Sequence, residues 1–309
     1  MIGIKNIGVY IPEIRENNLD RLQHFAIGKE FIDEKIGVLR LSRKNSDEKT
    51  SDLCVKAFKD LEAKEAGLQR RSLDCICLCT QNGDYCLPHT SAIVQAKLGL
   101  RSDCAAFDVA LGCSGYVYTL SIMKSFMQAN ELKNGLLFTA DPYSPILDPN
   151  DKNTQLLFGD AATATLLSEN SEIEIGKAAF STFGESHEAL IVRQNRTLQM
   201  NGRAIFNFAN REVPKNINKC LETNKVDSGD VDMFIFHQAS KYVIDNLVRR
   251  MQLDPKKVPF EIYDYGNTVS SSIPIILANH LFSLPAKVFL LSGFGVGLSA
   301  ATILLRVLK

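Results

Sequence analysis

The chain has 309 residues, of which 45% are apolar and 23% charged, which is ordinary for a folded globular protein. Lys and Arg together number 35, and so do Asp and Glu, so no excess of charge points to nucleic acid or an anionic membrane. No apolar run reaches the length of a membrane span, and the N-terminal MIGIKNIGVYIPE predicts a strand instead of the apolar core of a secretion signal. We therefore expect a cytoplasmic protein.

In chain order, helices and strands alternate through the first half. Segment 51–67 has Leu53, Ala57 and Leu61 at helical spacing, with Ser51 as the predicted N-cap and Gly67 at the exit. The pattern then predicts a strand at 74–79, a helix at 91–98, a strand at 105–111, a helix at 114–128, and strands at 134–141 and 163–168. These elements make up a predicted first domain, residues 1–168.

The second half, residues 169–309, repeats this alternation and forms the predicted second domain. Strands are expected at 173–183, 231–237, 287–294 and 301–308, and helices at 213–224, 241–253 and 271–282. Pro214 is placed in the first turn of its helix, where a missing N–H is tolerated. Such alternation predicts an α/β fold, with ligands bound where strand ends open into loops.

The eight cysteines do not indicate a disulfide framework, because no secretion signal accompanies them. Cys75, Cys77 and Cys79 alternate along one predicted strand with Ile76 and Leu78. Zinc sites usually take cysteines from turns at a spacing of two to four, with a second ligand pair elsewhere. We therefore predict buried small residues in a strand packed on both faces, and no metal site.

Three polar residues stand near predicted helix starts: Cys113 after the strand AAFDVAL, His237 after MFIF, and Asn267 in YGNTVSSS. A thiol at a helix N-terminus is close to unpaired N–H groups, which favour its thiolate and can stabilise an oxyanion. Each residue alone also has an ordinary structural explanation: a buried small side chain, a hydrogen-bonded histidine, or a helix cap. The ordered set is what points to chemistry.

Five segments together resemble the motifs of β-ketoacyl-acyl-carrier-protein synthase III, a family of thiolase-fold condensing enzymes. They are AAFDVALGCSGYVYTL, LLFGDAATATLL, MFIFHQAS, YDYGNTVSSSIPIIL and LLSGFGVGLSAATILLRV. They occur in the family's order, and the resemblance extends over almost the whole chain. It implies a thiolase-like fold in which two similar halves form α/β/α/β/α layers.

By this resemblance, Cys113 is the nucleophile that accepts an acyl group from a coenzyme A thioester. His237 and Asn267 match the pair that binds the carbonyl of a malonyl thioester. Decarboxylation there gives an enolate, which two hydrogen-bond donors stabilise, and its carbon attacks the acyl-cysteine. The implied reaction needs no metal or redox cofactor, only the coenzyme A thioester and malonyl carrier protein as substrates.

The resemblance also assigns the oxyanion hole to the backbone N–H groups of Cys113 and Val296. Val296 stands where the family commonly has glycine, and a β-branched residue disfavours positive φ, so we expect an ordinary backbone conformation at Val296. Phe158-Gly159-Asp160 matches a structural turn of the family. We interpret that turn as support for the neighbouring loop.

The expected donor site departs from the family. Phe31 and Lys35 stand where a tryptophan and an arginine are common, and Lys152 replaces another arginine. Phenylalanine still stacks and lysine still attracts phosphate, but the bidentate fork of arginine is lost. The sequence leaves open whether the acyl donor carries coenzyme A or a carrier protein.

The resemblance further implies two macromolecular contacts. Arg249 and Arg250, with Lys241 on the same helix, match positions that dock acidic acyl carrier protein, although Tyr242 and Asn207 replace basic residues there. Leu87, in TQNGDYCLPHT, matches a residue that reaches into the acyl pocket of the partner subunit in family homodimers.

Three alternatives stay open at this stage. The same fold could pass its acyl group to an oxygen or nitrogen acceptor, or serve a condensation in secondary metabolism or a surface-glycan pathway. A cysteine hydrolase also orders Cys, His and Asn in this way, but the context of Cys113 lacks the C-G-S-C-W motif of papain-like enzymes. The starter acyl group and the pathway are not predicted.

Overall fold

The computed structural model describes residues 1–193, 196–281 and 285–308. Within these ranges nine strands form one mixed sheet in the order β11-β12-β13-β8-β1-β7-β6-β4-β5. The strands are β1 (Gly3–Tyr10), β4 (Cys75–Cys79), β5 (Ala105–Val109), β6 (Asn134–Ala140), β7 (Ala162–Ser168), β8 (Ile173–Thr182), β11 (Met233–Phe236), β12 (Val288–Gly295) and β13 (Ser299–Val307). The sheet divides into a first group of strands, β1-β7-β6-β4-β5, and a second group, β11-β12-β13-β8. Among the described residues, the strands of the two groups pair with each other only through Gly3 with Glu174 and Ile4 with Ile173.

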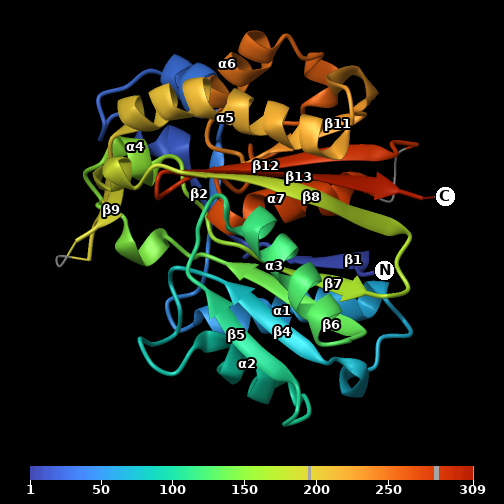
Figure 1. Cartoon of the computed structure of the whole chain (residues 1–309). Helices are drawn as coiled ribbons and strands as arrows, with labels where there is room; N and C mark the ends of the chain where they lie inside the picture. The colour runs from blue at the N-terminus through green and yellow to red at the C-terminus, as the bar shows by residue number, and fades with distance from the viewer. Residues whose placement is uncertain (194–195, 282–284, 309) are drawn as a thin grey trace.

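Helices lie in three layers around the two groups of strands (Figure 1). The helices are α1 (Thr50–Lys64), α2 (Thr90–Leu98), α3 (Gly115–Ala129), α5 (Gly202–Asn224), α6 (Lys241–Met251) and α7 (Ser272–His280). α1 and α2 cover the outer face of the first group, α5 covers the outer face of the second with α6 packed on it, and α3 and α7 lie between the groups. This confirms the predicted α/β/α/β/α layering; the division into two domains at residue 168 stays a prediction.

The apolar pattern of the strands explains the layers. Cys75 and Cys77 face the central core formed with α3 and α7, whereas Ile76 and Leu78 face the core under α1 and α2. A strand buried on both faces has a continuous apolar run, as predicted for this segment. Among the described residues, no three His, Cys, Asp or Glu side chains gather as a metal site would require.

Most predicted elements are confirmed within a few residues, but two local assignments are wrong. Pro214 lies deep inside α5, which begins twelve residues earlier at Gly202 and is capped by Asn201, whose side chain accepts the N–H of Ala204. Packing of residues such as Phe208 against the second group of strands outweighs the cost of an interior proline. The predicted end of the helix at 271–282 includes Phe282, which lies outside the described residues.

The second error concerns the N-cap of α1, which is Lys49 and not Ser51, so the helix starts two residues earlier than predicted. The backbone N–H of Lys49 donates to the Asp52 carboxylate at 2.9 Å. Ser51 lies inside the helix, where its hydroxyl donates to Asp84 at 2.6 Å. Ser51 therefore ties α1 to the loop after β4 instead of capping the helix.

Two small hairpins and two short helices lie near the strand ends that bear the candidate residues. The hairpins are β2 (Ile14–Asn17) with β3 (Arg40–Arg43) and β9 (Leu190–Val192) with β10 (Leu198–Met200); the helices are η2 (Phe31–Ile36) and α4 (Lys152–Gln155). The alternating pattern of the long elements contained no signal for any of them.

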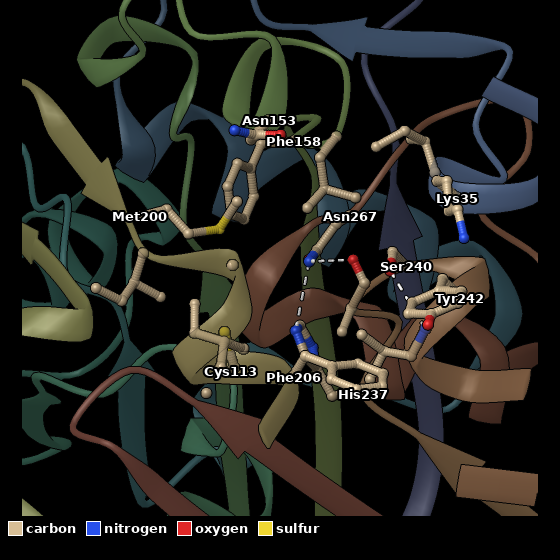
Figure 2. Close-up of a pocket in the computed structure, with 18 of the residues that line it drawn as sticks. Lys35, Cys113, Asn153, Phe158, Met200, Phe206, His237, Ser240, Tyr242 and Asn267 are labelled. Carbon is tan, nitrogen blue, oxygen red and sulfur yellow. Dashed lines mark hydrogen bonds between the residues drawn. The ribbon is translucent and has the colours of Figure 1, made fainter. Parts of the chain in front are cut away.

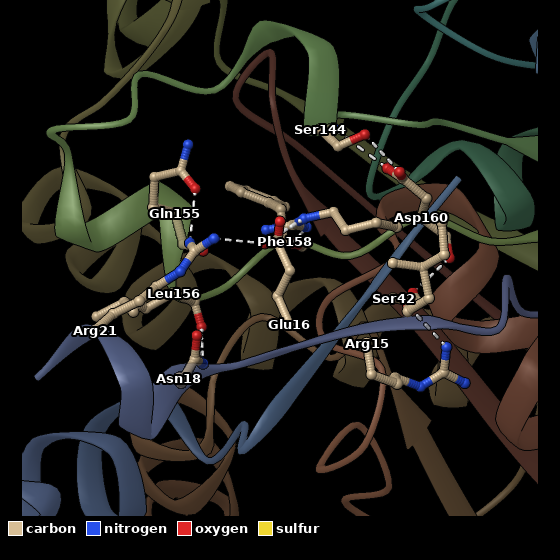
Figure 3. A network of polar contacts seen from close by, with 12 residues as sticks. Arg15, Glu16, Asn18, Arg21, Ser42, Ser144, Gln155, Leu156, Phe158 and Asp160 are labelled. Atoms are coloured by element: carbon tan, nitrogen blue, oxygen red, sulfur yellow. Dashed lines mark hydrogen bonds and ion pairs between the residues drawn. The ribbon is translucent and has the colours of Figure 1, made fainter. Parts of the chain in front are cut away.

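A polar network anchors the β2–β3 hairpin to the Phe158-Gly159-Asp160 turn (Figure 3). The buried Arg43 guanidinium donates to the Phe158 carbonyl at 2.6 Å and to Glu16 at 2.7 Å. The Ser42 hydroxyl donates to the Asp160 carbonyl at 2.6 Å. The turn also holds the loop of Asn267, because the Gly159 N–H donates to the Asn267 carbonyl at 2.9 Å. This supports the predicted structural role of the turn.

No described helix combines the length and the apolar character needed to cross a membrane.

The close contact at Gly159 predicts the effect of adding one methyl group. A β-carbon there would lie 1.8 Å from the Tyr265 carbonyl oxygen, so Gly159→Ala must displace the backbone that leads to Asn267. We expect the free energy of unfolding to fall by about 2–3 kcal/mol, and the melting temperature by roughly 5 °C or more. Thermal unfolding followed by circular dichroism measures this.

Gly229→Ala is the matched control, because a β-carbon at Gly229 would meet no atom within 4 Å. Equal melting temperatures for the two variants would contradict the prediction.

Candidate active site

A cavity of about 570 Å³ brings the three sequence-predicted residues together (Figure 2). Cys113, His237 and Asn267 all line it. Cys113 lies between β5 and α3, His237 follows β11, and Asn267 lies in the loop before α7. Because these elements come from both halves of the chain, the site exists only when the two groups of strands are packed together.

Cys113 occupies a tight turn that contacts the end of β12. The turn is closed by the Gly115 N–H, which donates to the Gly112 carbonyl at 2.7 Å. A β-carbon on Gly293 would lie 2.7 Å from the Cys113 carbonyl oxygen, and one on Gly295 would lie 2.7 Å from the Cys113 sulfur. The two glycines therefore allow β12 to approach the thiol to within a distance that no larger residue permits.

Burial dominates the electrostatics of the thiol. Only 4% of Cys113 is exposed, and this burial raises the pKa of its thiol to about 12. Hydrogen bonds from the backbone N–H groups of Val296 and Cys113 lower the pKa, but by less. We expected the N–H groups at the helix end to favour the thiolate. In the resting site the loss of water raises the pKa of the thiol by more than those N–H groups lower it, so Cys113 is a thiol at neutral pH.

His237 is buried and neutral. Loss of water lowers its pKa to about 3, against a hydrogen bond to the backbone of Val269 that raises it. Its Nδ1 lies 2.8 Å from the Ser272 hydroxyl, and Phe294 packs edge-on against the imidazole ring. These contacts fix the ring so that Nε2 is directed toward Asn267 (Figure 2).

The Asn267 side chain is oriented by the backbone that follows it. Its Oδ1 accepts the Val269 N–H at 2.9 Å, which leaves Nδ2 toward the cavity, 3.4 Å from His237 Nε2 and 3.4 Å from the Ala239 carbonyl. Two long contacts do not saturate an amide that can donate two hydrogen bonds. Nδ2 is therefore a donor available to a ligand oxygen beside His237.

The loop after β12 places the positive φ angles on glycines. Gly295 has φ 155° and Gly297 φ 136°, whereas Val296 is not among the described residues with positive φ. Val296 therefore has the ordinary backbone conformation predicted for a β-branched residue. Its N–H is near enough to the Cys113 sulfur to lower the pKa of the thiol, as the N–H of Cys113 itself does.

The predicted donor residues lie at the mouth of the same cavity. Phe31 and Lys35 line it, and the Lys152 amine lies 5.4 Å from the centre of the Phe31 ring. The Lys35 amine lies 4.0 Å from the centre of the Tyr242 ring, whose plane stacks on Phe206 at 5.1 Å. Tyr242 thus contacts both an aromatic ring and a cation, an arrangement that sequence reasoning missed.

The residues predicted for macromolecular contact lie outside the cavity. Lys241 forms an ion pair with Asp245 on its own helix, Arg249 donates to Asn246 at 2.9 Å, and Arg250 is exposed. Leu87, in the loop before α2, is 86% exposed. In a single chain, so much exposure leaves nearly the whole apolar side chain of this leucine in water.

Sequence reasoning also missed Ser272 and Phe294, which hold His237. Ser272 falls inside the predicted helix 271–282, and Phe294 is the last residue of the predicted strand 287–294. The signal for both is weak, since their contact with His237 depends on the packing of β12 and α7 against the end of β11.

Comparison with known proteins places these features in one family. The profile of 3-oxoacyl-[acyl-carrier-protein] synthase III matches residues 107–184, and the profile of its C-terminal region matches residues 221–307. The chain is 32% identical to β-ketoacyl-[acyl-carrier-protein] synthase III of Streptococcus pneumoniae over 98% of both chains.

Solved structures agree with the sequence match. The crystal structure of 3-oxoacyl-[acyl-carrier-protein] synthase III from Aquifex aeolicus superposes with a TM-score of 0.92 at 30% identity, covering 99% of this chain and 100% of that one. The corresponding Thermus thermophilus structure has a TM-score of 0.92 at 29% identity over 98% of both chains.

The raised pKa of Cys113 predicts how its alkylation depends on pH. Only the thiolate reacts, so the rate with iodoacetamide should rise about tenfold per pH unit between roughly pH 7 and pH 10, without a plateau, because the pKa lies near 12. Peptide mass spectrometry measures the alkylation rate of Cys113 at each pH, with the exposed Cys86 as an internal control for reagent access.

A rate that levels off below about pH 8 would contradict this, since the helix end would then already hold a thiolate.

Proposed function

This chain belongs to the 3-oxoacyl-[acyl-carrier-protein] synthase III family, and we propose that it loads an acyl group onto Cys113 and condenses it with a malonyl thioester. One observation carries the proposal: Cys113, beside the backbone N–H groups of Val296 and of Cys113 itself, lines one cavity with His237 and Asn267. This arrangement supplies a nucleophile, an oxyanion hole and a pair of polar side chains for a second carbonyl.

In the loading step, the Cys113 sulfur attacks the carbonyl carbon of the donor thioester. A new C–S bond forms, the donor C–S bond breaks, and the proton of Cys113 ends on the departing thiolate. The N–H groups of Cys113 and Val296 stabilise the intermediate oxyanion. Because burial keeps His237 neutral, its imidazole is available to carry the proton between the two sulfurs.

In the condensation step, loss of carbon dioxide from the malonyl thioester leaves an enolate oxygen. His237 Nε2 and Asn267 Nδ2 lie 3.4 Å apart, so a single oxygen beside them can accept a hydrogen bond from each. The enolate carbon then attacks the acyl-Cys113 carbonyl, and the Cys113 sulfur leaves.

Ser272 can serve both steps, because a hydroxyl both donates and accepts. When Ser272 donates to the Val269 carbonyl at 2.9 Å, it accepts from His237 Nδ1–H and leaves Nε2 bare for the proton of Cys113. When it donates to Nδ1 instead, Nε2 carries the hydrogen that bonds the enolate oxygen. We propose that both tautomers of His237 are used in this way.

The chain is proposed to act as a homodimer in the cytoplasm and to receive malonyl groups from acyl carrier protein. The exposed Leu87 supports the dimer, since a partner subunit would cover it. Arg249 and Arg250 are the proposed contacts with the acidic carrier; Lys241 contributes less while it is paired with Asp245.

Asn267→Ala separates condensation from loading. Loading relies on backbone donors, so the variant should form acyl-Cys113 at a near-normal rate. Loss of one donor to the enolate should slow carbon dioxide release from malonyl-carrier protein about 100- to 1,000-fold. His237→Ala should slow it similarly, with some loss of loading. Intact mass and carbon dioxide release are the two measurements.

Cys113→Ala is the control, and it should give no stable acyl adduct. If the wild-type enzyme never decarboxylates a malonyl thioester but passes its acyl group to an alcohol or amine, the condensing function is wrong.

The donor residues predict weak recognition of coenzyme A. The lysines at 35 and 152 contact aromatic rings and present no bidentate fork to a phosphate. We expect the triple variant Phe31→Trp, Lys35→Arg, Lys152→Arg to lower the KM for acyl-coenzyme A by severalfold without changing loading from acyl carrier protein. Steady-state loading kinetics measure both. An unchanged KM would mean that this mouth serves a different donor.

A further inference from the structure

The side chains of His237 and Asn267 are both oriented by one residue, Val269. The N–H of Val269 donates to Asn267 Oδ1 at 2.9 Å, and its carbonyl accepts the Ser272 hydroxyl at 2.9 Å. That hydroxyl lies 2.8 Å from His237 Nδ1. The backbone conformation of Val269 therefore sets the directions of both side chains in the proposed donor pair.

Val269 has a backbone conformation that valine disfavours. Its φ is 54°, in the left-handed region. Among the described non-glycine residues with positive φ, it is the only β-branched one and the only buried one. Such a conformation is strained in a β-branched residue, so it persists only where surrounding contacts impose it. Relaxation to a negative φ would turn the N–H and the carbonyl of Val269 away from Asn267 and Ser272.

A buried carboxylate from the first half of the chain holds this part of the backbone. Val269 begins the short helix η8 (Val269–Ser271), and the hydroxyl of its second residue, Ser270, donates to Asp141 Oδ2 at 2.6 Å. Asp141 directly follows β6, and its Oδ1 accepts the Gln81 N–H at 2.6 Å. Burial raises the pKa of Asp141 to about 6, so at neutral pH it is mostly ionised and its hydrogen bonds are charge-assisted.

Two further contacts surround η8. The Ser271 hydroxyl lies 2.8 Å from Thr139 Oγ1, near the end of β6. A β-carbon on Gly112 would lie 3.3 Å from Val269 Cγ1, so the valine side chain packs against the cysteine turn. Among these contacts the hydrogen bond to Asp141 is the charged one, and it acts on the residue next to Val269.

We propose that Asp141 is a positioning residue for the condensation step, and that it acts by holding Val269, through Ser270, in the left-handed conformation. In that conformation Val269 directs Asn267 and His237 toward the enolate oxygen. Asp141 does not line the active-site cavity, so it acts through these residues and not on the substrate. This inference rests on the proposed function.

Ser270→Ala tests the proposal, because it removes the hydroxyl that Asp141 holds and leaves the catalytic side chains in place. We expect kcat for carbon dioxide release from malonyl-carrier protein to fall about tenfold with little change in KM, and loading of Cys113 to slow less than threefold. Asp141→Asn has one acceptor oxygen instead of two and should act in the same direction. Thermal unfolding shows that each variant is folded.

A matched pair of backgrounds separates positioning from loss of stability. Val269→Ala and Val269→Gly both remove the valine side chain, but only glycine adopts a φ of 54° without strain. Adding Ser270→Ala should therefore cost about tenfold in the Val269→Ala background and less than twofold in the Val269→Gly background. A merely structural hydrogen bond would cost the same in both.

Ser51→Ala is the control for deleting a buried hydrogen bond between a serine and an aspartate. The Ser51 hydroxyl donates to Asp84 at 2.6 Å, the same distance as from Ser270 to Asp141, but on α1 and outside the cavity. This variant should lower the melting temperature about as much as Ser270→Ala and change carbon dioxide release less than twofold.

The imidazole ¹⁵N resonances of His237, assigned by their loss in His237→Ala, test the proposal without any substrate. Ser270→Ala should shift them in the wild-type and Val269→Ala backgrounds but not in the Val269→Gly background. Unshifted resonances in Ser270→Ala, or equal shifts in all three backgrounds, would overturn the inference. A wild-type protein that releases no carbon dioxide would instead remove the condensing function, and the His237 resonances would still decide this inference.

Discussion

The contact between the end of β12 and the Cys113 turn is the constraint on which the site depends. Gly293 and Gly295 have no side chains, so β12 can lie against the backbone and sulfur of Cys113. That contact joins the first group of strands to the second at the reactive atom, and it brings the Val296 N–H to the sulfur. A side chain at either glycine would push β12 away from the Cys113 turn, and with it Val296, whose N–H is the proposed oxyanion donor.

This packing sets the protonation states of Cys113 and His237 in the resting site. Excluding water raises the pKa of Cys113 to about 12 and lowers that of His237 to about 3, so both groups are neutral. A neutral site suits a reaction in which negative charge appears only transiently, because hydrogen bonds to an oxyanion are stronger where water is excluded. In the proposed mechanism, Cys113 becomes nucleophilic when the substrate is bound, through transfer of its proton.

The sequence predicted what depends on local pattern. Alternation located the long strands and helices, and the turn glycines and strand ends pointed to Cys113, His237 and Asn267 as a set. Features that depend on long-range packing were missed. The start of α5 is set by its apolar contacts and not by Pro214, and the prediction of a thiolate at Cys113 did not take the burial of the thiol into account. Ser272 had no recognisable signal, because its partner His237 is 35 residues away in sequence.

The placement of the three residues also bears on the proposed order of the chemistry. Cys113, His237 and Asn267 line one cavity, so in the proposed mechanism the acyl group on Cys113 and the malonyl thioester occupy it together. Val296 departs from the glycine common in the family, yet its N–H is still the proposed oxyanion donor beside the Cys113 sulfur. The glycines on either side of Val296 have the positive φ angles, so a β-branched residue is tolerated at the position of the proposed donor.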